Sequence, residues 1–178
     1  MTTNDDELGA KLRGCHFHGS YEQWKLARDC FVPYVRDAND VLDIGCANGF
    51  LLQSLMDWGG RTFTPWGIDI RETSIDAARA MFPDHADNFV VADMTTLAWT
   101  ERRVDVVLAP FFEYPEYMGA VATYLEKHPS SSVVFSVYDD EMERFDGMVT
   151  TCRDRFAVVD QITLRENWCG LLRVCAAT

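Results

Sequence analysis

Basic residues are scarce in this chain. Of its 178 residues, 16 are Lys or Arg and 28 are Asp or Glu, so the formal net charge is −12. A protein that grips a phosphate backbone needs clustered cations, whereas the Lys and Arg residues here are scattered along the sequence. We therefore expect no nucleic-acid partner. The acidic balance favours a neutral or cationic small ligand instead.

The chain also lacks paired cysteines and long apolar runs. Its six cysteines form no C-x-x-C motif, which excludes the common zinc and thioredoxin-type patterns, and we expect no metal site. No apolar run approaches the roughly 20 residues that span a bilayer. The polar, acidic start over residues 1–8 differs from a signal peptide. These features predict a cytoplasmic protein without a membrane partner.

No repeat, low-complexity tract or long linker divides the sequence, which predicts a single domain. Residues 1–19 are polar and without clear period, so we expect a flexible N-terminal arm, with the domain over 20–178. Ser20 and Gln23 have the spacing of a capping box, and apolar residues then recur at helical spacing. The pattern predicts a helix over 20–37.

Beyond residue 40, predicted strands and helices alternate. The predicted strands are 41–44, 63–70, 88–92, 104–109, 132–138, 156–164 and 168–176, and the predicted helices are 50–58, 73–82, 117–127 and 140–152. This order indicates an α/β fold, a doubly wound and mostly parallel sheet with helices on both faces. The last two strands, joined near Asn167, predict an antiparallel hairpin.

A glycine-rich turn over residues 45–49 follows the first predicted strand and opens a helix. A strand, a glycine turn and a helix in this order are typical of a nucleotide-binding corner. The dinucleotide fingerprint G-x-G-x-x-G is incomplete, because Ala47 and Phe50 stand at its second and third glycine positions. The sequence therefore disfavours a nicotinamide oxidoreductase and favours a nucleoside without a pyrophosphate.

Three acidic residues follow or end successive predicted strands. Asp43, at the mouth of the glycine turn, would repel phosphates and attract an ammonium group. Asp69 ends the second strand, where an acid commonly holds ribose hydroxyls. Asp93 follows the third strand and is placed to accept from an adenine amine, with Met94 packed on the ring. Each acid has a structural alternative, because such residues also cap helices or satisfy turn amides.

Together these segments resemble the motifs of class I S-adenosylmethionine-dependent methyltransferases. Residues 42–49 resemble the first motif, 67–69 the second and 92–94 the third. The resemblance covers roughly residue 41 to the C-terminus. It implies a Rossmann-like seven-stranded sheet of order 3-2-1-4-5-7-6 with strand 7 antiparallel. It also implies S-adenosylmethionine as cofactor and S-adenosylhomocysteine as product.

The resemblance further implies the role of each motif. The first-motif acid and glycines meet the methionine portion of the cofactor, the second-motif acid holds the ribose, and the third-motif acid meets the adenine. The predicted cofactor-binding residues are Asp43, Gly45, Cys46, Ala47, Asn48, Gly49, Asp69, Ile70, Asp93, Met94 and Pro110.

The end of the fourth predicted strand departs from the amino-methylating relatives. Ala109 replaces their polar Asn or Asp, and Phe111 replaces their second proline, which counts against methylation of an exocyclic amine by the usual route. The aromatic residues around Glu113 would line an acceptor pocket, although part of this run is equally well explained as core. Glu113, Tyr114 and His18 are the candidates for a catalytic base.

The sequence thus predicts an S-adenosylmethionine-dependent methyltransferase that acts on a small-molecule acceptor by in-line methyl transfer. The segment 14–35 is expected to fold over the cofactor as a lid, and a homodimer is left open. One alternative is a catalytically inactive module or partner subunit that binds the same cofactor. Another is an aminopropyl transferase that uses the decarboxylated cofactor.

Overall fold

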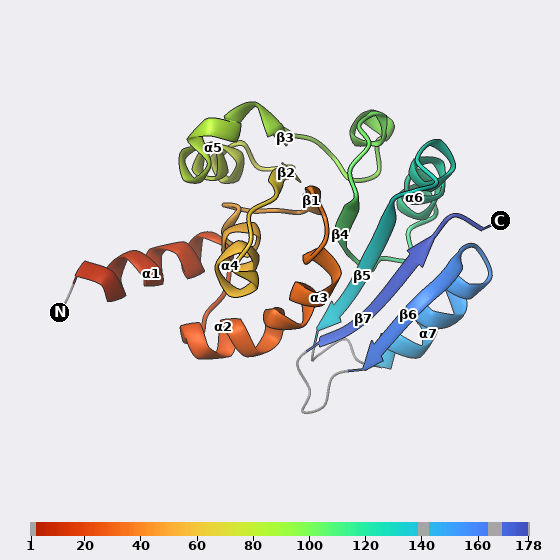
Figure 1. Cartoon of the computed structure of the whole chain (residues 1–178), viewed down its shortest axis with the longest axis horizontal. Helices are drawn as coiled ribbons and strands as arrows, with labels where there is room; N and C mark the ends of the chain where they lie inside the picture. The colour runs from red at the N-terminus through yellow and green to blue at the C-terminus, as the bar shows by residue number, and fades with distance from the viewer. Residues whose placement is uncertain (1–2, 139–142, 164–168, 178) are drawn as a thin grey trace.

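The computed structural model describes residues 3–138, 143–163 and 169–177 (Figure 1). Its strands are β1 Asp40–Ile44, β2 Thr64–Asp69, β3 Phe89–Val91, β4 Val106–Pro110, β5 Ser132–Tyr138, β6 Ala157–Thr163 and β7 Cys169–Cys175. Its α-helices are α1 Thr3–Gly14, α2 Tyr21–Arg28, α3 Val32–Val35, α4 Phe50–Gly59, α5 Glu72–Met81, α6 Pro115–Lys127 and α7 Glu143–Arg153. Short 3-10 helices are η1 Asp29–Phe31, η2 Pro83–Asn88 and η3 Leu97–Glu101.

The strands form one sheet of order β3-β2-β1-β4-β5-β7-β6. The first five strands are parallel to their neighbours, and β7 pairs antiparallel with both β5 and β6. The predicted α/β class, strand order and antiparallel strand are therefore confirmed. The turn predicted near Asn167 lies outside the described residues. Because the strands β1 to β5 are parallel, their carboxyl ends meet at one edge of the sheet.

Helices cover both faces of the sheet (Figure 1). Alternate residues of a strand point to opposite faces, and β1 shows this directly. Val41 belongs to a buried cluster that includes Leu52 of α4 and Ile75 of α5. Its neighbour Leu42 belongs to the cluster on the other face, which includes Tyr117 of α6. The sheet is thus the middle of three layers.

The N-terminal region differs from the flexible arm and single helix expected from the sequence. Residues 3–14 form α1, because Leu8 and Leu12 fall on one helical face and pack with Trp24 and Phe50. The predicted capping box at the start of α2 is confirmed. The N–H of Gln23 donates to the Ser20 hydroxyl, and the N–H of Ser20 donates to the Gln23 side chain. The remainder of 20–37 is divided among α2, η1 and α3.

None of the helices in residues 3–138, 143–163 and 169–177 is both long and apolar enough to cross a bilayer. Over the same ranges, no group of three or more His, Cys, Asp or Glu side chains is arranged to hold a metal ion.

Candidate functional site

The turn between β1 and α4 contains three residues with left-handed backbone, namely Gly45 (φ 78°), Ala47 (φ 49°) and Gly49 (φ 78°). A Cβ placed on Gly45 would meet no atom within 4 Å, whereas one on Gly49 would lie 3.0 Å from the ring of Phe82. Ala47 is secured in its unusual conformation because its N–H donates to Asp69 Oδ2 at 3.1 Å. The turn is therefore open on the Gly45 side, where a ligand can approach the backbone.

The side chains of Cys46 and Asn48 serve the packing of this turn. Cys46 is buried, and its Sγ lies 2.6 Å from where a Cβ of Gly67 would stand, so the absent side chain on β2 makes room for it. Asn48 donates from Nδ2 to the carbonyl of Lys11 at 2.8 Å and accepts at Oδ1 from the N–H of Phe50 at 3.2 Å. Both residues thus shape the turn from inside.

Asp43 carries a buried carboxyl group at the carboxyl end of β1. Its side chain is 7% exposed, and no hydrogen bond to its carboxylate is found among the described residues. Burial raises its pKa to about 7, the nearby Asp69 carboxylate adds to the rise, and the charge of Arg28 opposes it. An ionised carboxylate is costly to bury unless it is paired. The site is therefore suited to a ligand that brings a positive charge.

Asp69, one strand away, is already hydrogen-bonded. Its Oδ1 accepts from the backbone N–H of Arg71 at 2.9 Å and from Nε of the same residue at 3.2 Å, while Oδ2 accepts from Ala47. Burial alone would raise its pKa, but the Arg71 contacts and the Ala47 N–H outweigh it and hold the pKa below the ordinary value. Arg71 in turn contacts the ring of His16. Asp69 is thus an ionised acceptor at neutral pH.

A cavity of about 200 Å³, here called the turn cavity, opens beside the glycine turn. Strand ends and the turn form one side of it, and the N-terminal helices form the other. It is lined by Cys15, Trp24, Arg28, Phe31, Asp43, Ile44, Gly45, Cys46, Ala47, Leu51, Leu108, Ala109, Pro110 and Ser136. A buried acid and an arginine therefore share one small cavity that is otherwise mostly apolar.

The structure brings part of the predicted cofactor-binding set together. Five of its members line the turn cavity, namely Asp43, Gly45, Cys46, Ala47 and Pro110. The other members, Asn48, Gly49, Asp69, Ile70, Asp93 and Met94, do not line it. Of these, Asn48, Gly49 and Asp69 are joined to the turn by sequence or by the hydrogen bond to Ala47. Ile70 follows β2 and is 69% exposed, an unusual environment for a large apolar side chain.

Asp93 and Met94 follow β3. Asp93 is exposed, and its Oδ1 accepts from the N–H and the hydroxyl of Thr95 at 2.8 and 2.7 Å, which hold its pKa below the ordinary value. This is the turn-stabilising arrangement that the sequence left open as the structural alternative. Met94 packs at the edge of the core, and its carbonyl accepts from the indole N–H of Trp99 at 3.0 Å.

The three candidate catalytic residues are exposed and do not line the turn cavity. Tyr114 is 55% exposed and stacks on Phe112. The carboxylate of Glu113 lies against α7, since a Cβ on Gly147 would come within 3.3 Å of its Oε1. His18 lies in the connection that precedes α2. Their proposed roles therefore depend on where an acceptor binds.

Sequence reasoning missed Arg28, which lines the cavity from α2. Its guanidinium lies over Trp24, 4.0 Å from the ring centroid, and its positive charge lowers the pKa of Asp43. The signal was present, because Trp24 and Arg28 are four residues apart and share a helix face. A cation on the otherwise apolar buried stripe of a helix points to an anionic partner.

Comparison with known proteins agrees with the motif assignment. Residues 41–128 match the model of a methyltransferase domain family. This range contains the glycine turn and the three acids that carry the resemblance described above. No curated protein matches the sequence significantly.

Several solved structures share the fold over nearly the whole chain. An N-methyltransferase, NodS, from Bradyrhizobium japonicum in complex with S-adenosylhomocysteine is 16% identical, with 96% of this chain and 98% of that chain covered and a TM-score of 0.60. A S-adenosylmethionine-dependent methyltransferase from Aquifex aeolicus is 15% identical, with 87% and 93% covered and a TM-score of 0.62. The PH0226 protein of Pyrococcus horikoshii is 17% identical, with 90% and 92% covered and a TM-score of 0.64. At these identities the likeness shows the fold.

The fold and the glycine turn with its acids define a Rossmann-like methyltransferase domain. Residues 41–128 match a methyltransferase domain family, and the fold of the chain is that of S-adenosylmethionine-dependent methyltransferases. The family and its cofactor, both predicted from the sequence, are thereby confirmed.

Proposed function

We propose that this protein transfers the methyl group of S-adenosylmethionine to a small-molecule acceptor. The observation that carries the proposal is that Asp43 and Arg28 both line one cavity beside the open Gly45 turn. The methionine portion of the cofactor has an ammonium and a carboxylate on the same carbon. An acid and a guanidinium in a single small cavity match these two groups in charge.

Each part of the cofactor has a place along the strand ends. Asp43 takes the ammonium, and Arg28, held flat on Trp24, takes the carboxylate. Asp69 accepts from the ribose hydroxyls, which replace its two longer bonds to the Arg71 guanidinium at 3.2 and 3.4 Å. The exposed Ile70 then covers one face of the adenine ring and loses that exposure.

The adenine end is completed by the residues after β3. Asp93 has one carboxylate oxygen occupied by Thr95, which leaves the second to accept from the adenine amine. Met94 lies beside it on the way to η3. Asp93 is ionised because its hydrogen bonds lower its pKa, so it acts as an acceptor rather than a donor.

Held by Asp43, Arg28 and Asp69, S-adenosylmethionine would supply a methyl group activated by its positively charged sulfur, which would keep the electron pair of the broken bond. The protein's task is to place the acceptor in line and to exclude water. Trp24, Phe31 and Pro110 give the turn cavity apolar walls that suit this task. Glu113, Tyr114 and His18 remain our candidates for a base, which is needed only if the acceptor must lose a proton.

The segment 14–35 acts as a lid in this proposal. Four of its residues line the turn cavity, namely Cys15, Trp24, Arg28 and Phe31, so the segment would lie against a cofactor bound there. Limited proteolysis should show slower cleavage of this segment when S-adenosylhomocysteine is present. Equal cleavage rates with and without the ligand would argue against a lid.

Calorimetry with three ligands tests the proposal. S-adenosylhomocysteine should bind, 5′-methylthioadenosine, which lacks the amino-acid portion, should bind more weakly, and NAD should not compete. Arg28→Met should lower the affinity for S-adenosylhomocysteine about tenfold and leave the affinity for methylthioadenosine unchanged. Lys25→Met, on the same helix but outside the turn cavity, is the matched control. Preference for NAD would refute the cofactor assignment, and an unchanged affinity in Arg28→Met would refute the role of Arg28.

Turnover separates an enzyme from an inactive binding module. Incubation with S-adenosylmethionine carrying a labelled methyl group and a pool of small metabolites should release S-adenosylhomocysteine and label an acceptor. Tight cofactor binding without any label transfer would favour the binding-module alternative.

A further inference from the structure

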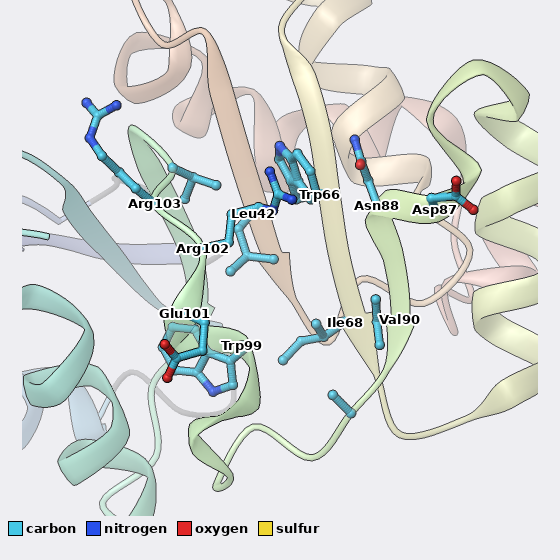
Figure 2. A pocket seen from close by; sticks show the side chains of 12 residues that line it. Leu42, Trp66, Ile68, Asp87, Asn88, Val90, Trp99, Glu101, Arg102 and Arg103 are labelled. Carbon is cyan, nitrogen blue, oxygen red and sulfur yellow. The ribbon is translucent and has the colours of Figure 1, made fainter. Parts of the chain in front are cut away.

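A second cavity lies away from the glycine turn, on the face of the sheet. It has a volume of about 630 Å³ and is lined by Leu42, Trp66, Ile68, Asp87, Asn88, Val90, Ala92, Trp99, Glu101, Arg102, Arg103 and Val104. We call it the sheet-face pocket. Figure 2 shows Leu42, Trp66, Ile68 and Val90 on neighbouring strands of its floor, with Trp99, Glu101 and Arg102 beside them.

The pocket exists because one crossover of the sheet carries no α-helix. The connections β1 to β2, β2 to β3 and β4 to β5 contain α4, α5 and α6, of 10, 10 and 13 residues. The connection between β3 and β4 spans residues 92–105 and contains η3, a 3-10 helix of 5 residues. α6 and α7 pack on the β4 to β7 part of this face. Over β2 and β3 the face is left partly open, and Val90 is 49% exposed.

The two indole rings of the pocket offer only their apolar surfaces. The ring N–H of Trp66 donates to Asp40 Oδ1 at 3.2 Å, and that of Trp99 donates to the carbonyl of Met94 at 3.0 Å. A ligand therefore gains no hydrogen bond from either indole. Its main body must be apolar, and a flat ring matches a floor made of strand side chains and aromatic surfaces.

Arg102 adds a positive charge at this floor. Its guanidinium lies 3.9 Å from the ring centroid of Trp66, and no ion pair of Arg102 is found in the part of the chain that the structure describes. The adjacent carboxylates have other partners, because Glu101 pairs with Lys127 and Asp40 accepts from Trp66. A guanidinium stacked on a ring directs its N–H groups outward in its own plane, which is the geometry that receives a carboxylate edge-on.

The remaining charges of the lining fix the orientation of such a ligand. Arg103 is engaged with Asp105 at 3.1 Å. Asp87 lies beyond Asn88, on the other side of the pocket from Arg102 (Figure 2). An anion at that end would be repelled, so the acidic group of a ligand belongs at Arg102 and its ring extends over Ile68 and Val90.

We propose that the sheet-face pocket binds a flat aromatic molecule that carries one carboxylate, paired with Arg102. The volume of about 630 Å³ is in the range of small-molecule sites and exceeds what a two-ring compound needs. This site is separate from the turn cavity, since the two share no lining residue. It is therefore independent of the proposed methyl transfer.

The test compares 2-naphthoate with its neutral analogue 2-naphthamide by calorimetry on the full chain, with S-adenosylhomocysteine present and absent. Naphthoate should bind about tenfold more tightly than naphthamide, as expected of one charge-assisted pair. Arg102→Gln should remove this difference by weakening naphthoate alone. Arg36→Gln, an exposed arginine outside every cavity described above, is the matched control and should change neither affinity.

A second variant addresses the floor. Val90→Asp places an acid on an exposed floor position, where folding should tolerate it, and should weaken both ligands by about tenfold or more. Equal binding of the two ligands, or unchanged naphthoate affinity in Arg102→Gln, would overturn the proposal. Competition with S-adenosylhomocysteine would place naphthoate in the cofactor site instead. If neither ligand binds, and the chain self-associates in a way that Val90→Asp abolishes, the proposal is wrong and the face is an interface with a second copy of the chain.

Discussion

The carboxyl ends of β1 and β2 differ from that of β4, although all three lie at one edge of the sheet. At β1 and β2 two carboxylates, Asp43 and Asp69, are 7% and 6% exposed and face an open glycine turn. At β4 the chain continues into Phe111, which is 1% exposed, and into fully buried Tyr117, whose hydroxyl donates to the Pro110 carbonyl at 2.9 Å. The first region thus has polar groups beside an open turn, whereas in the second region the polar groups bond to each other within the core.

The largest expected effect contrasts two aromatics after β4. Phe111→Ala should lower the free energy of unfolding by about 3–5 kcal/mol, because a fully buried ring leaves a cavity. Tyr114→Ala, at a position that is 55% exposed, should change it by less than about 0.5 kcal/mol. Urea denaturation measures both. Similar losses for the two variants would show that the boundary between core and acceptor surface has been drawn in the wrong place.

Next in size is the loss of cofactor affinity in Asp69→Asn. The change removes the negative charge but retains the shape and an acceptor for the Ala47 N–H. Two charge-assisted hydrogen bonds to the ribose are weakened, so the Kd of S-adenosylhomocysteine should rise about 100-fold. Calorimetry gives the Kd, and urea denaturation should show a loss of at most about 1 kcal/mol, because the ion pair with Arg71 is partly exposed. A large fall in stability with unchanged affinity would make Asp69 a structural residue of the turn.

Tyr124→Phe should lower stability and leave cofactor affinity unchanged, in contrast to Asp69→Asn. The Tyr124 hydroxyl accepts from the N–H of Val104 at 3.0 Å, in a buried position on α6 that does not line the turn cavity. Its removal leaves a buried N–H without a partner and should cost about 2 kcal/mol in the free energy of unfolding. The affinity for S-adenosylhomocysteine should stay within twofold of the wild type. A change in that affinity would mean that the two regions are coupled.

The smallest expected effect is a pH dependence that originates at Asp43. Since its pKa is raised to about 7, ionisation increases between pH 6 and 8, and the affinity for the ammonium of S-adenosylhomocysteine should rise roughly tenfold over this range. Asp43→Asn should bind weakly with no such rise. Calorimetry at several pH values measures this, and a wild-type affinity that does not vary with pH would contradict the pairing.

The same group affects stability without ligand in the opposite sense. The native carboxyl keeps its proton up to about pH 7, whereas an unfolded chain loses it near the ordinary value of 3.8. The native state thus holds more protons between these limits, and the contribution of Asp43 to stability falls as pH rises from about 4 to 7. At pH 8, Asp43→Asn should therefore be more stable than the wild type in urea denaturation.

Local sequence signals were sufficient for the sheet and the glycine turn. The strand order followed from the family resemblance that the motifs carry, and the turn followed from glycines, whose φ of 78° few other residues adopt. The aromatic residues that follow β4 could not be assigned to core or surface from the sequence, because a run of consecutive aromatics has no period that separates the two. Only the structure separates Phe111, at 1% exposure, from Tyr114 at 55%.

Long-range contacts account for what was missed. The helix α1 forms because Leu12 finds Trp24 and Phe50, and this packing is invisible in a polar, aperiodic segment. The sheet-face pocket depends on a crossover without an α-helix, and its Arg102 becomes notable only when stacked on Trp66 from a distant strand. Such pairs are set by topology, which single-residue tendencies do not encode.

The side chain of Asn48 has a practical consequence for anyone who shortens this protein. One amide both ties the last turn of α1 to the glycine turn and caps the first N–H of α4. A truncated version that starts at Ser20 would lose the Lys11 carbonyl and leave Leu12's neighbours, Trp24 and Phe50, facing water. Trimming the N-terminus for crystallisation would thus remove Cys15 from the lining of the turn cavity and loosen the packing behind the glycine turn.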